Sequence, residues 1–294
     1  MFSKKLFPNE SIIEIQELSP GYEDHASDVW LVKTTDREVI VRSSKMVDEP
    51  SNAFWWGCHN LFGIDPRRLT ELNIIHQTLS NQTQIPIPTL FDVKKIDEKE
   101  FALLEKLQGA TIHSFIDQHP SMIKSLGAGL AGIHSIKRDY IGSPSRTFHV
   151  SLNQFHSHVT ETMSQLVSKF YDDKKDFKEL LHTTRTQLQH IPHPESSTFV
   201  LVDIDPTQFL SDGNTITGLV DTEAYVVAPR ELDFIGLEYV LDEPSAAAFK
   251  EGYQTVLEMP QLEHVRIPYR FLYRLLSVQG NVELETWMNQ KILF

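Results

Sequence analysis

The chain is poor in several features that would mark particular protein classes. It has a single cysteine, Cys58, in 294 residues, which excludes an internal disulfide and a zinc site built from several cysteines. No apolar run approaches the roughly 20 residues that a membrane-spanning helix needs. The first residues carry two lysines without a sustained apolar segment, so we expect no signal peptide. These absences favour a cytoplasmic protein with no membrane association.

Basic residues are also in deficit. The sequence has 27 Lys and Arg against 40 Asp and Glu, a formal net charge of −13. Because binding to phosphate backbones needs a basic face, we do not expect nucleic acid as a partner. The acidic balance favours a small neutral or cationic ligand. The sequence contains neither GxxxxGK[ST] nor GxGxxG, which argues against a P-loop and against a Rossmann dinucleotide site.

The first third of the chain has the pattern of a β-sheet. Alternating apolar residues bounded by turn residues predict an antiparallel meander of three strands at 12–18, 29–35 and 38–44, and two further strands within 85–109. One helix is expected over 65–81, with Asp65 as its N-cap and Pro66 in its first turn. We expect the aromatic-rich segment 46–64 to be irregular, either a plug packed on a helix or a wall for substrate.

The rest of the chain is mainly helical in pattern. Apolar residues at helical spacing predict helices at 121–136, 155–170, 233–242 and 246–259. Strand patterns interrupt them at 199–203, 207–213 and 215–221, with the sequence SDGN as a hairpin turn. We therefore predict an α+β protein of two lobes with a cleft between them. Residues 1–106 would form a five-stranded antiparallel sheet with one helix, and 107–294 a mainly helical lobe with small β-hairpins.

Acidic and amide side chains gather where these short strands end. Asp203 ends the apolar strand 199–203 and is followed by Asp205 and Gln208, and Asp221 ends the strand 215–221 and is followed by Glu223. Carboxylates beside buried strands need a cation or hydrogen-bond donors as partners. Ligands that offer only oxygen suit Mg²⁺, which completes its shell with water and substrate phosphates. The alternative is that these residues only cap the hairpin ends.

The segment LVDIDPTQFLSDGNTITGLVDTE, residues 201–223, resembles the catalytic loop and metal-binding segment of the aminoglycoside phosphotransferase and choline kinase family. Other matches to this family follow in order along the chain: EVIVRSS resembles its third strand, FALLEKLQGATI its hinge, APRELDF its structural Asp helix and FKEGYQTV a late helix. The resemblance implies a bilobal protein-kinase-like fold, and ATP with Mg²⁺ as cofactors.

The resemblance also assigns roles in the second lobe. Asp203 falls on the catalytic Asp, which would accept or orient the proton of a substrate hydroxyl. Gln208 and Asp221 fall on the two metal ligands. Asp205 and Glu223 remain open between contacts with substrate or a second metal ion and simple hydrogen bonding in the loop.

In the first lobe the resemblance places Arg42 on the nucleotide phosphates, with Lys45 as its competitor for this role. Glu71 falls on the helix Glu that would pair with Arg42. Ser27 lies in the segment HASDVWLV, which resembles the phosphate-covering loop. Arginine suits phosphate because its guanidinium stays charged and can bind in a bidentate manner.

The sequence departs from the family pattern at three positions of the catalytic loop. Leu201 and Val202 stand in place of His and Gly, and Gln208 in place of Asn. Two functions therefore stay open. The first is an ATP-dependent phosphotransferase that phosphorylates a hydroxyl of an aminoglycoside-like, macrolide-like or amino-alcohol substrate. The alternative is a pseudokinase that binds nucleotide or another ligand without transferring phosphate. We expect Asp233 and His134 to be structural.

Overall fold

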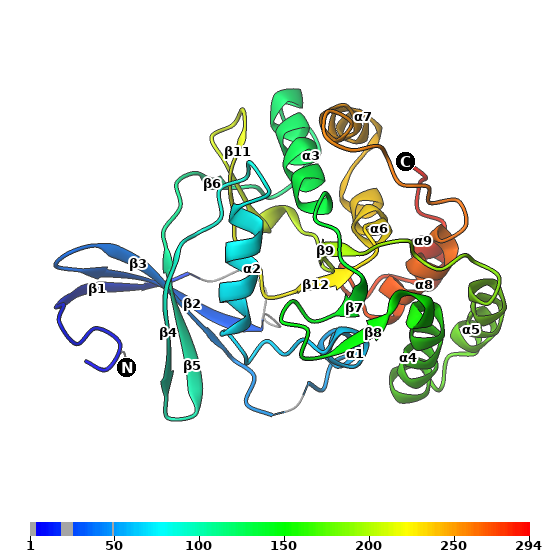
Figure 1. Cartoon of the computed structure of the whole chain (residues 1–294), viewed down its shortest axis with the longest axis horizontal. Helices are drawn as coiled ribbons and strands as arrows, with labels where there is room; N and C mark the ends of the chain where they lie inside the picture. The colour runs from blue at the N-terminus through cyan, green and yellow to red at the C-terminus, as the bar shows by residue number, and fades with distance from the viewer. Residues whose placement is uncertain (1–3, 19–25, 49) are drawn as a thin grey trace.

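The computed structural model describes residues 4–18, 26–48 and 50–294, and shows two lobes (Figure 1). The N-terminal lobe is built on a five-stranded antiparallel sheet with the order β1-β2-β3-β5-β4. Its strands are β1 (Ile12–Glu17), β2 (Ser27–Thr34), β3 (Glu38–Ser44), β4 (Leu90–Ile96) and β5 (Lys99–Glu105). The expected five-stranded sheet is therefore confirmed.

Alternation along β3 explains how this sheet serves two purposes. Val39 and Val41 are fully buried and pack with Leu6, Phe7 and Leu103 on one face. Ile40 and Arg42 point to the other face, where both line a cavity between the lobes. Because successive side chains of a strand point to opposite faces, the same strand supplies the core of the lobe and a charged group for the cleft.

A helix that the sequence pattern did not predict follows β3 in the chain. Segment 46–64 was expected to be irregular, and this was wrong, because α1 spans Ala53–Phe62. Asn52 Oδ1 accepts a hydrogen bond from the Trp55 amide at 2.8 Å, and Gly63 closes the helix with φ of +72°. These hydrogen bonds at both ends stabilise a helix whose aromatic residues have only a modest intrinsic preference for helix. Cys58 is buried in the core of the helical lobe, so α1 belongs to that lobe by packing.

Helix α2 (Glu71–Ser80) begins later than expected. Asp65 was expected to be its N-cap, which was wrong. Its Oδ1 instead accepts from the Arg67 amide at 3.0 Å, and its carboxylate pairs with the Arg67 guanidinium at 2.7 Å. The carboxylate is thus used in a local turn before the helix starts.

The C-terminal lobe is mainly helical. Its helices are α3 (Pro120–His134), α4 (Phe155–Phe170), α5 (Lys175–Leu188), α6 (Glu231–Val240), α7 (Glu243–Tyr253), α8 (Arg266–Leu275) and α9 (Leu284–Met288). Helices α3 and α7 lie close together, since a Cβ on Gly252 would stand 2.0 Å from the Lys124 carbonyl oxygen. Glycine is required there by the approach of the two backbones.

Two small sheets interrupt these helices. One has the order β11-β10-β6 and the other β8-β7-β12-β9. The strands of the first are β6 (Ala110–Thr111), β10 (Phe209–Ser211) and β11 (Ile216–Leu219), and those of the second are β7 (Tyr140–Gly142), β8 (His149–Ser151), β9 (Thr198–Leu201) and β12 (Tyr225–Ala228). The expected strands near 199, 209 and 216 are present. Strand β9 pairs with β12, however, so the acidic loops leave from two different sheets.

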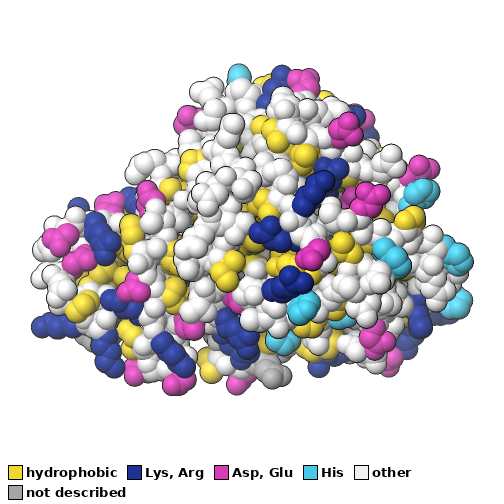
Figure 2. Space-filling model, viewed as in Figure 1, with side chains coloured by type: hydrophobic (Ala, Val, Ile, Leu, Met, Phe, Trp, Pro, Cys, Tyr) yellow, Lys and Arg dark blue, Asp and Glu magenta, His cyan; other side chains and the backbone are white. Residues whose placement is uncertain are grey.

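The surface carries charged side chains of both signs on the face in view (Figure 2). Figure 2 shows acidic and basic side chains interspersed over it. Among the residues that the structure describes, no helix is long and apolar enough to cross a membrane.

Candidate active site

Two cavities adjoin in the cleft between the sheet and the helical lobe. The first has a volume of about 440 Å³ and the second about 690 Å³. Both are lined by the same five residues, Val29, Arg42, Thr207, Asp221 and Glu223. Three of the charged residues that the sequence singled out, Arg42, Asp221 and Glu223, therefore stand where the two cavities meet.

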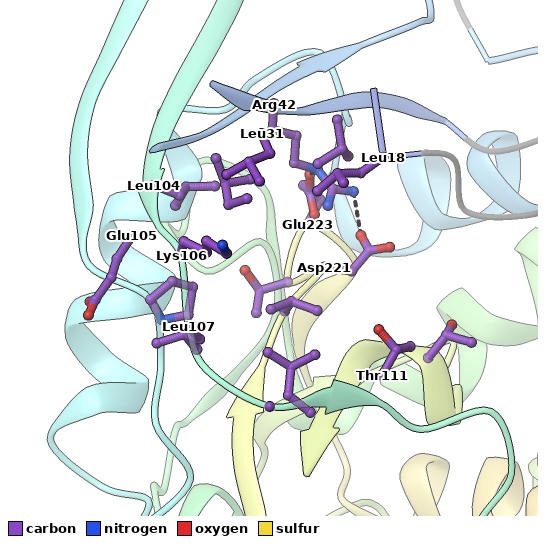
Figure 3. A pocket seen from close by; sticks show the side chains of 18 of the residues that line it. Leu18, Leu31, Arg42, Leu104, Glu105, Lys106, Leu107, Thr111, Asp221 and Glu223 are labelled. Carbon is purple, nitrogen blue, oxygen red and sulfur yellow. Dashed lines mark hydrogen bonds and ion pairs between the residues drawn. The ribbon is translucent and has the colours of Figure 1, made fainter. Parts of the chain in front are cut away.

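The first cavity is mainly apolar. Leu31, Ile40 and Leu104 from the sheet, and Leu107 from the segment that follows β5, contribute to its walls. Figure 3 shows Leu104 and Leu107 at the side opposite Asp221, with Arg42 and Glu223 near Asp221. Arg42, Asp221 and Glu223 thus stand at one end of the cavity, and Leu104 and Leu107 stand at the other with Glu105 and Lys106 beside them (Figure 3).

The second cavity is acidic on one side. Asp203, Asp205, Asp221 and Glu223 contribute four carboxylates to its lining. The start of α1, at residues 52–55, and the loop at 277–281 form other parts of its wall. A ligand here would meet carboxylates together with the ring of Trp55.

The loop after β9 is shaped by its own side chains. Asp205 Oδ1 accepts from the Thr207 amide at 2.8 Å, and Gln208 Oε1 accepts from the Asp205 amide at 2.9 Å. Gln208 Nε2 donates to the Asp203 carbonyl oxygen at 2.7 Å. This reciprocal capping fixes the turn. Because an amide oxygen has two lone pairs, Gln208 keeps one for a further ligand.

Asp203 has an altered acidity. Burial of its carboxyl raises the pKa of Asp203 to about 7, and the charges of Asp205 and Asp221 act in the same direction. A hydrogen bond from the Gln279 backbone opposes the rise. A carboxyl with a pKa near neutrality can hold or release a proton under physiological conditions.

Arg42 joins the two acidic segments. Its Nη2 pairs with Asp221 Oδ1, and its Nε lies against Glu223 Oε1 as an ion pair rather than as a well-directed hydrogen bond. The side chains of Arg42 and Glu223 are 12% and 7% exposed, whereas that of Asp221 is 43% exposed. The backbone of Asp221 is left-handed, with φ of +60°. The structure thus brings three of the predicted site residues together.

Glu71 is placed differently from our expectation. It accepts hydrogen bonds from the Ser145 amide at 3.2 Å and the Ser145 hydroxyl at 2.6 Å. No ion pair between Glu71 and Arg42 occurs among the described residues, so the expected pairing is not made in this structure.

Of the other two residues predicted in the N-terminal lobe, Ser27 lines a cavity and Lys45 does not. Ser27 is buried and lines the second cavity, while His25, the first residue of the expected phosphate-covering segment HASDVWLV, lies outside the described residues. Lys45 pairs with Asp28 at 3.7 Å and lines neither cavity. Arg42 is therefore the better placed of the two cations.

His76 is a site residue that sequence reasoning missed. It lines the first cavity, where its Nδ1–H donates to the Pro88 carbonyl oxygen at 2.8 Å and its Nε2 accepts from the Thr222 hydroxyl at 2.8 Å. Burial lowers the pKa of His76 to about 4, and the charge of Arg42 acts in the same direction. Its position among Leu72, Ile75 and Leu79 on one face of α2 was the available signal.

A buried pair of residues supports the end of β9. Asp233 and His134 are buried, and their side chains are joined at 2.9 Å. Asp233 Oδ1 also accepts from the Leu201 amide at 3.0 Å, which fixes the end of β9. Both residues are structural, as expected.

The donor set can be tested against Mg²⁺. Within the described part of the chain, no group of three or more His, Cys, Asp or Glu residues could hold a metal ion. Asp221 and Gln208 both line the second cavity, on segments joined by a hydrogen bond from the Val220 amide to the Gln208 carbonyl oxygen at 2.7 Å. Two such ligands fit Mg²⁺ only if phosphates and water complete its shell, which is the usual arrangement for this ion.

Comparisons with known proteins bear on the family and the fold. Residues 15–267 match the model of the family described as APH, the phosphotransferase enzyme family. Among curated proteins, none has significant sequence similarity to the chain.

Solved structures share the fold at low sequence identity. A mutant of aminoglycoside 2′-phosphotransferase-IIIa in complex with GDP is 15% identical, with 97% of this chain and 91% of that chain covered and a TM-score of 0.65. Spectinomycin phosphotransferase with ADP and spectinomycin is 14% identical, with 93% and 84% covered and a TM-score of 0.60. A putative fructosamine-3-kinase from Haemophilus somnus is 14% identical, with 98% and 94% covered and a TM-score of 0.62.

The two lobes, the site at their junction and the match over most of the length lead to one conclusion: the chain belongs to the phosphotransferase enzyme family and has a protein-kinase-like fold.

Proposed function

We propose that the chain is a small-molecule kinase that transfers the γ-phosphate of ATP to a hydroxyl group of a small substrate. The observation that carries this proposal is the meeting of Arg42, Asp221 and Glu223 at the junction of an apolar and an acidic cavity. A nucleotide in the first cavity would direct its phosphates to this junction. An acceptor in the second cavity would approach from the opposite side.

The apolar cavity suits the base of a nucleotide. Leu31 and Ile40 on one side and Leu107 and Leu210 on the other provide apolar surfaces. Binding sites of this type combine such surfaces with a few polar groups that fix orientation. Two structural relatives contain ADP or GDP, which supports a purine nucleotide as the ligand.

Asp221 and Gln208 would hold Mg²⁺, which when bound neutralises phosphate charge. The guanidinium of Arg42 is charged and offers five N–H donors, of which Nη1 and part of Nη2 remain for phosphate oxygens. These residues bind and orient the nucleotide. Phosphoryl transfer depends mainly on such positioning and charge neutralisation.

Asp203 would handle the proton of the acceptor. The acceptor oxygen forms a bond to the γ-phosphorus, and the bond from that phosphorus to the β–γ bridging oxygen of ATP breaks, so that ADP leaves with this oxygen. The hydroxyl proton moves to the Asp203 carboxylate and then to solvent. Because the pKa of Asp203 is about 7, part of the protein carries this carboxyl in the ionised form at neutral pH.

The acidic cavity favours an acceptor that is cationic or rich in hydroxyl groups. Its four carboxylates would attract an amine, and Trp55 offers an apolar surface. An aminoglycoside, a macrolide bearing an amine or an amino alcohol has this chemistry.

A pseudokinase is the second candidate function. Gln208 Oε1 already accepts the Asp205 amide hydrogen, and Asp221 is already paired with Arg42. Both predicted metal ligands are thus engaged within the protein. A chain of this kind could bind nucleotide without Mg²⁺ and without turnover.

The two candidates differ in a thermal-shift titration with ATP, because a ligand that binds only the native state raises the melting temperature. Stabilisation that requires Mg²⁺, together with ADP release in a screen of hydroxyl-bearing amines, supports the kinase. Stabilisation without Mg²⁺ and without ADP release supports the pseudokinase. Absence of any shift contradicts both.

A further inference from the structure

We propose that Glu223, and not Glu71, is the residue that positions Arg42 on the nucleotide phosphates, and that Glu71 holds helix α2 on the helical lobe. The inference rests on the proposed nucleotide site. The carboxylate that orients Arg42 would then come from the segment after β11, whereas the sequence predicted that it comes from α2.

The surroundings of Glu223 require a cation. Its side chain is 7% exposed, and its Oε2 has no hydrogen-bond partner among the described residues. Arg42 is the cation that it contacts, through Nε and Oε1. A buried carboxylate without a partner is strongly unfavourable, so Glu223 and Arg42 hold each other in place.

The two carboxylates on Arg42 are not equivalent. Asp221 is 43% exposed and pairs with the terminal Nη2, whereas Glu223 is buried and pairs with Nε, nearer the stem of the side chain. Asp221 can exchange Arg42 for a metal ion. Glu223 can keep Nε while the terminal nitrogens turn to phosphate oxygens, and it therefore acts as the fixed support.

Glu71 is engaged away from Arg42. Its two oxygens accept separately from the amide and hydroxyl of Ser145, in the segment between β7 and β8. A second contact from α2, from His76 to Thr222 at 2.8 Å, also reaches the helical lobe. Helix α2 is thus tied to that lobe at two points, and Glu71 supplies one of them.

The test is calorimetric titration of ADP with Mg²⁺ into the wild-type protein and into Glu223→Gln, Glu71→Gln and Arg42→Ala, alone and combined. Glu10→Gln is the matched control, since Glu10 pairs with Arg37 at 3.0 Å and lines neither cavity. We expect Glu223→Gln to raise the Kd about tenfold, the effect of one charge-assisted contact. Glu71→Gln should raise it far less, and Glu10→Gln should leave it unchanged.

The double variants distinguish positioning from a general loss of structure. If Glu223 acts through Arg42, Glu223→Gln adds nothing to the loss caused by Arg42→Ala. Glu223→Asp keeps the charge and must bind ADP more tightly than Glu223→Gln, and it serves as the test if the Gln variant does not fold. Melting temperatures are measured for every variant.

Several results would overturn the inference. The first is that Glu223→Gln binds ADP as tightly as the wild-type protein, or more tightly. The second is that Glu71→Gln raises the Kd as much as Glu223→Gln does. The third is that the losses of ADP affinity in Glu223→Gln and Arg42→Ala add in the double variant. If the wild-type protein fails to bind ADP, the proposed function falls and this inference with it. If the wild-type protein binds and the Glu223 effect is absent, the inference alone is wrong.

Discussion

His76 should contribute to the stability of the protein at neutral pH, and this contribution should be lost in mildly acidic solution. This imidazole is buried and satisfied in its neutral form, by the Pro88 carbonyl oxygen and the Thr222 hydroxyl. Burial lowers the pKa of His76 from 6.5 to about 4. Between these values the unfolded chain binds a proton that the folded protein excludes. The contribution of the neutral His76 side chain to the free energy of unfolding is therefore fully present above pH 6.5 and is lost as the pH falls toward 4.

The size of the effect follows from the two pKa values of His76. The complete loss corresponds to ~3 kcal/mol, of which ~2 kcal/mol is reached at pH 5. Glutamine cannot titrate in this range. We therefore predict that the free energy of unfolding of His76→Gln falls by ~2 kcal/mol less than that of the wild-type protein between pH 7.5 and pH 5. At pH 7.5 the variant itself is less stable by ~1 kcal/mol or more, because it cannot reproduce both hydrogen bonds.

Urea unfolding at the two pH values, without nucleotide or metal, measures this difference. His182→Gln, at an exposed position of α5, is the matched control and should follow the wild-type protein. Comparing variants cancels the titration of all other groups. If wild-type and His76→Gln proteins lose the same free energy of unfolding between pH 7.5 and pH 5, the reasoning is refuted.

Three further predictions concern the site and its supports. Asp203→Ala should abolish ADP release with the best acceptor while leaving the Kd for ATP with Mg²⁺ nearly intact, and equal loss of both would contradict the assigned role. Gln208→Asn should lower the melting temperature, because the shorter amide cannot bridge the Asp205 amide and the Asp203 carbonyl oxygen; an unchanged melting temperature would show that the loop does not depend on these bonds. Gly252→Ala should destabilise the protein by more than ~2 kcal/mol in urea unfolding, since its Cβ would stand 2.0 Å from the Lys124 carbonyl oxygen, and near-normal stability would mean that α3 and α7 can move apart.

The N-terminal sheet was predictable because its pattern is local. Val39 and Val41 alternate with Ile40 and Arg42, which fixes the two faces of β3 without knowledge of any other element. Helix α1 was missed because its aromatic-rich segment shows no clear period. The caps at Asn52 and Gly63 were the only local signals.

Pairing between distant segments was not predictable from the sequence. Strand β9 pairs with β12, which follows an acidic loop and was not identified from its short apolar run. Asp203, Asp221 and Arg42 were found because their order and spacing resemble a known family. The carboxylate partner of Arg42 could not be predicted in this way, because it depends on how closely separate segments of the chain approach each other. In this chain Glu223 reaches Arg42, and Glu71 reaches Ser145.

The central claim is that the cleft binds a nucleotide and metal through Arg42, Asp221 and Gln208. A crystal structure of the protein with ADP and Mg²⁺ tests it most directly. We predict the base between the apolar walls near Leu31 and Leu107, the metal on Asp221 and Gln208, and Arg42 on a phosphate oxygen. Nucleotide bound outside this cleft, or phosphates that contact neither Arg42 nor a metal on Asp221, would contradict the account.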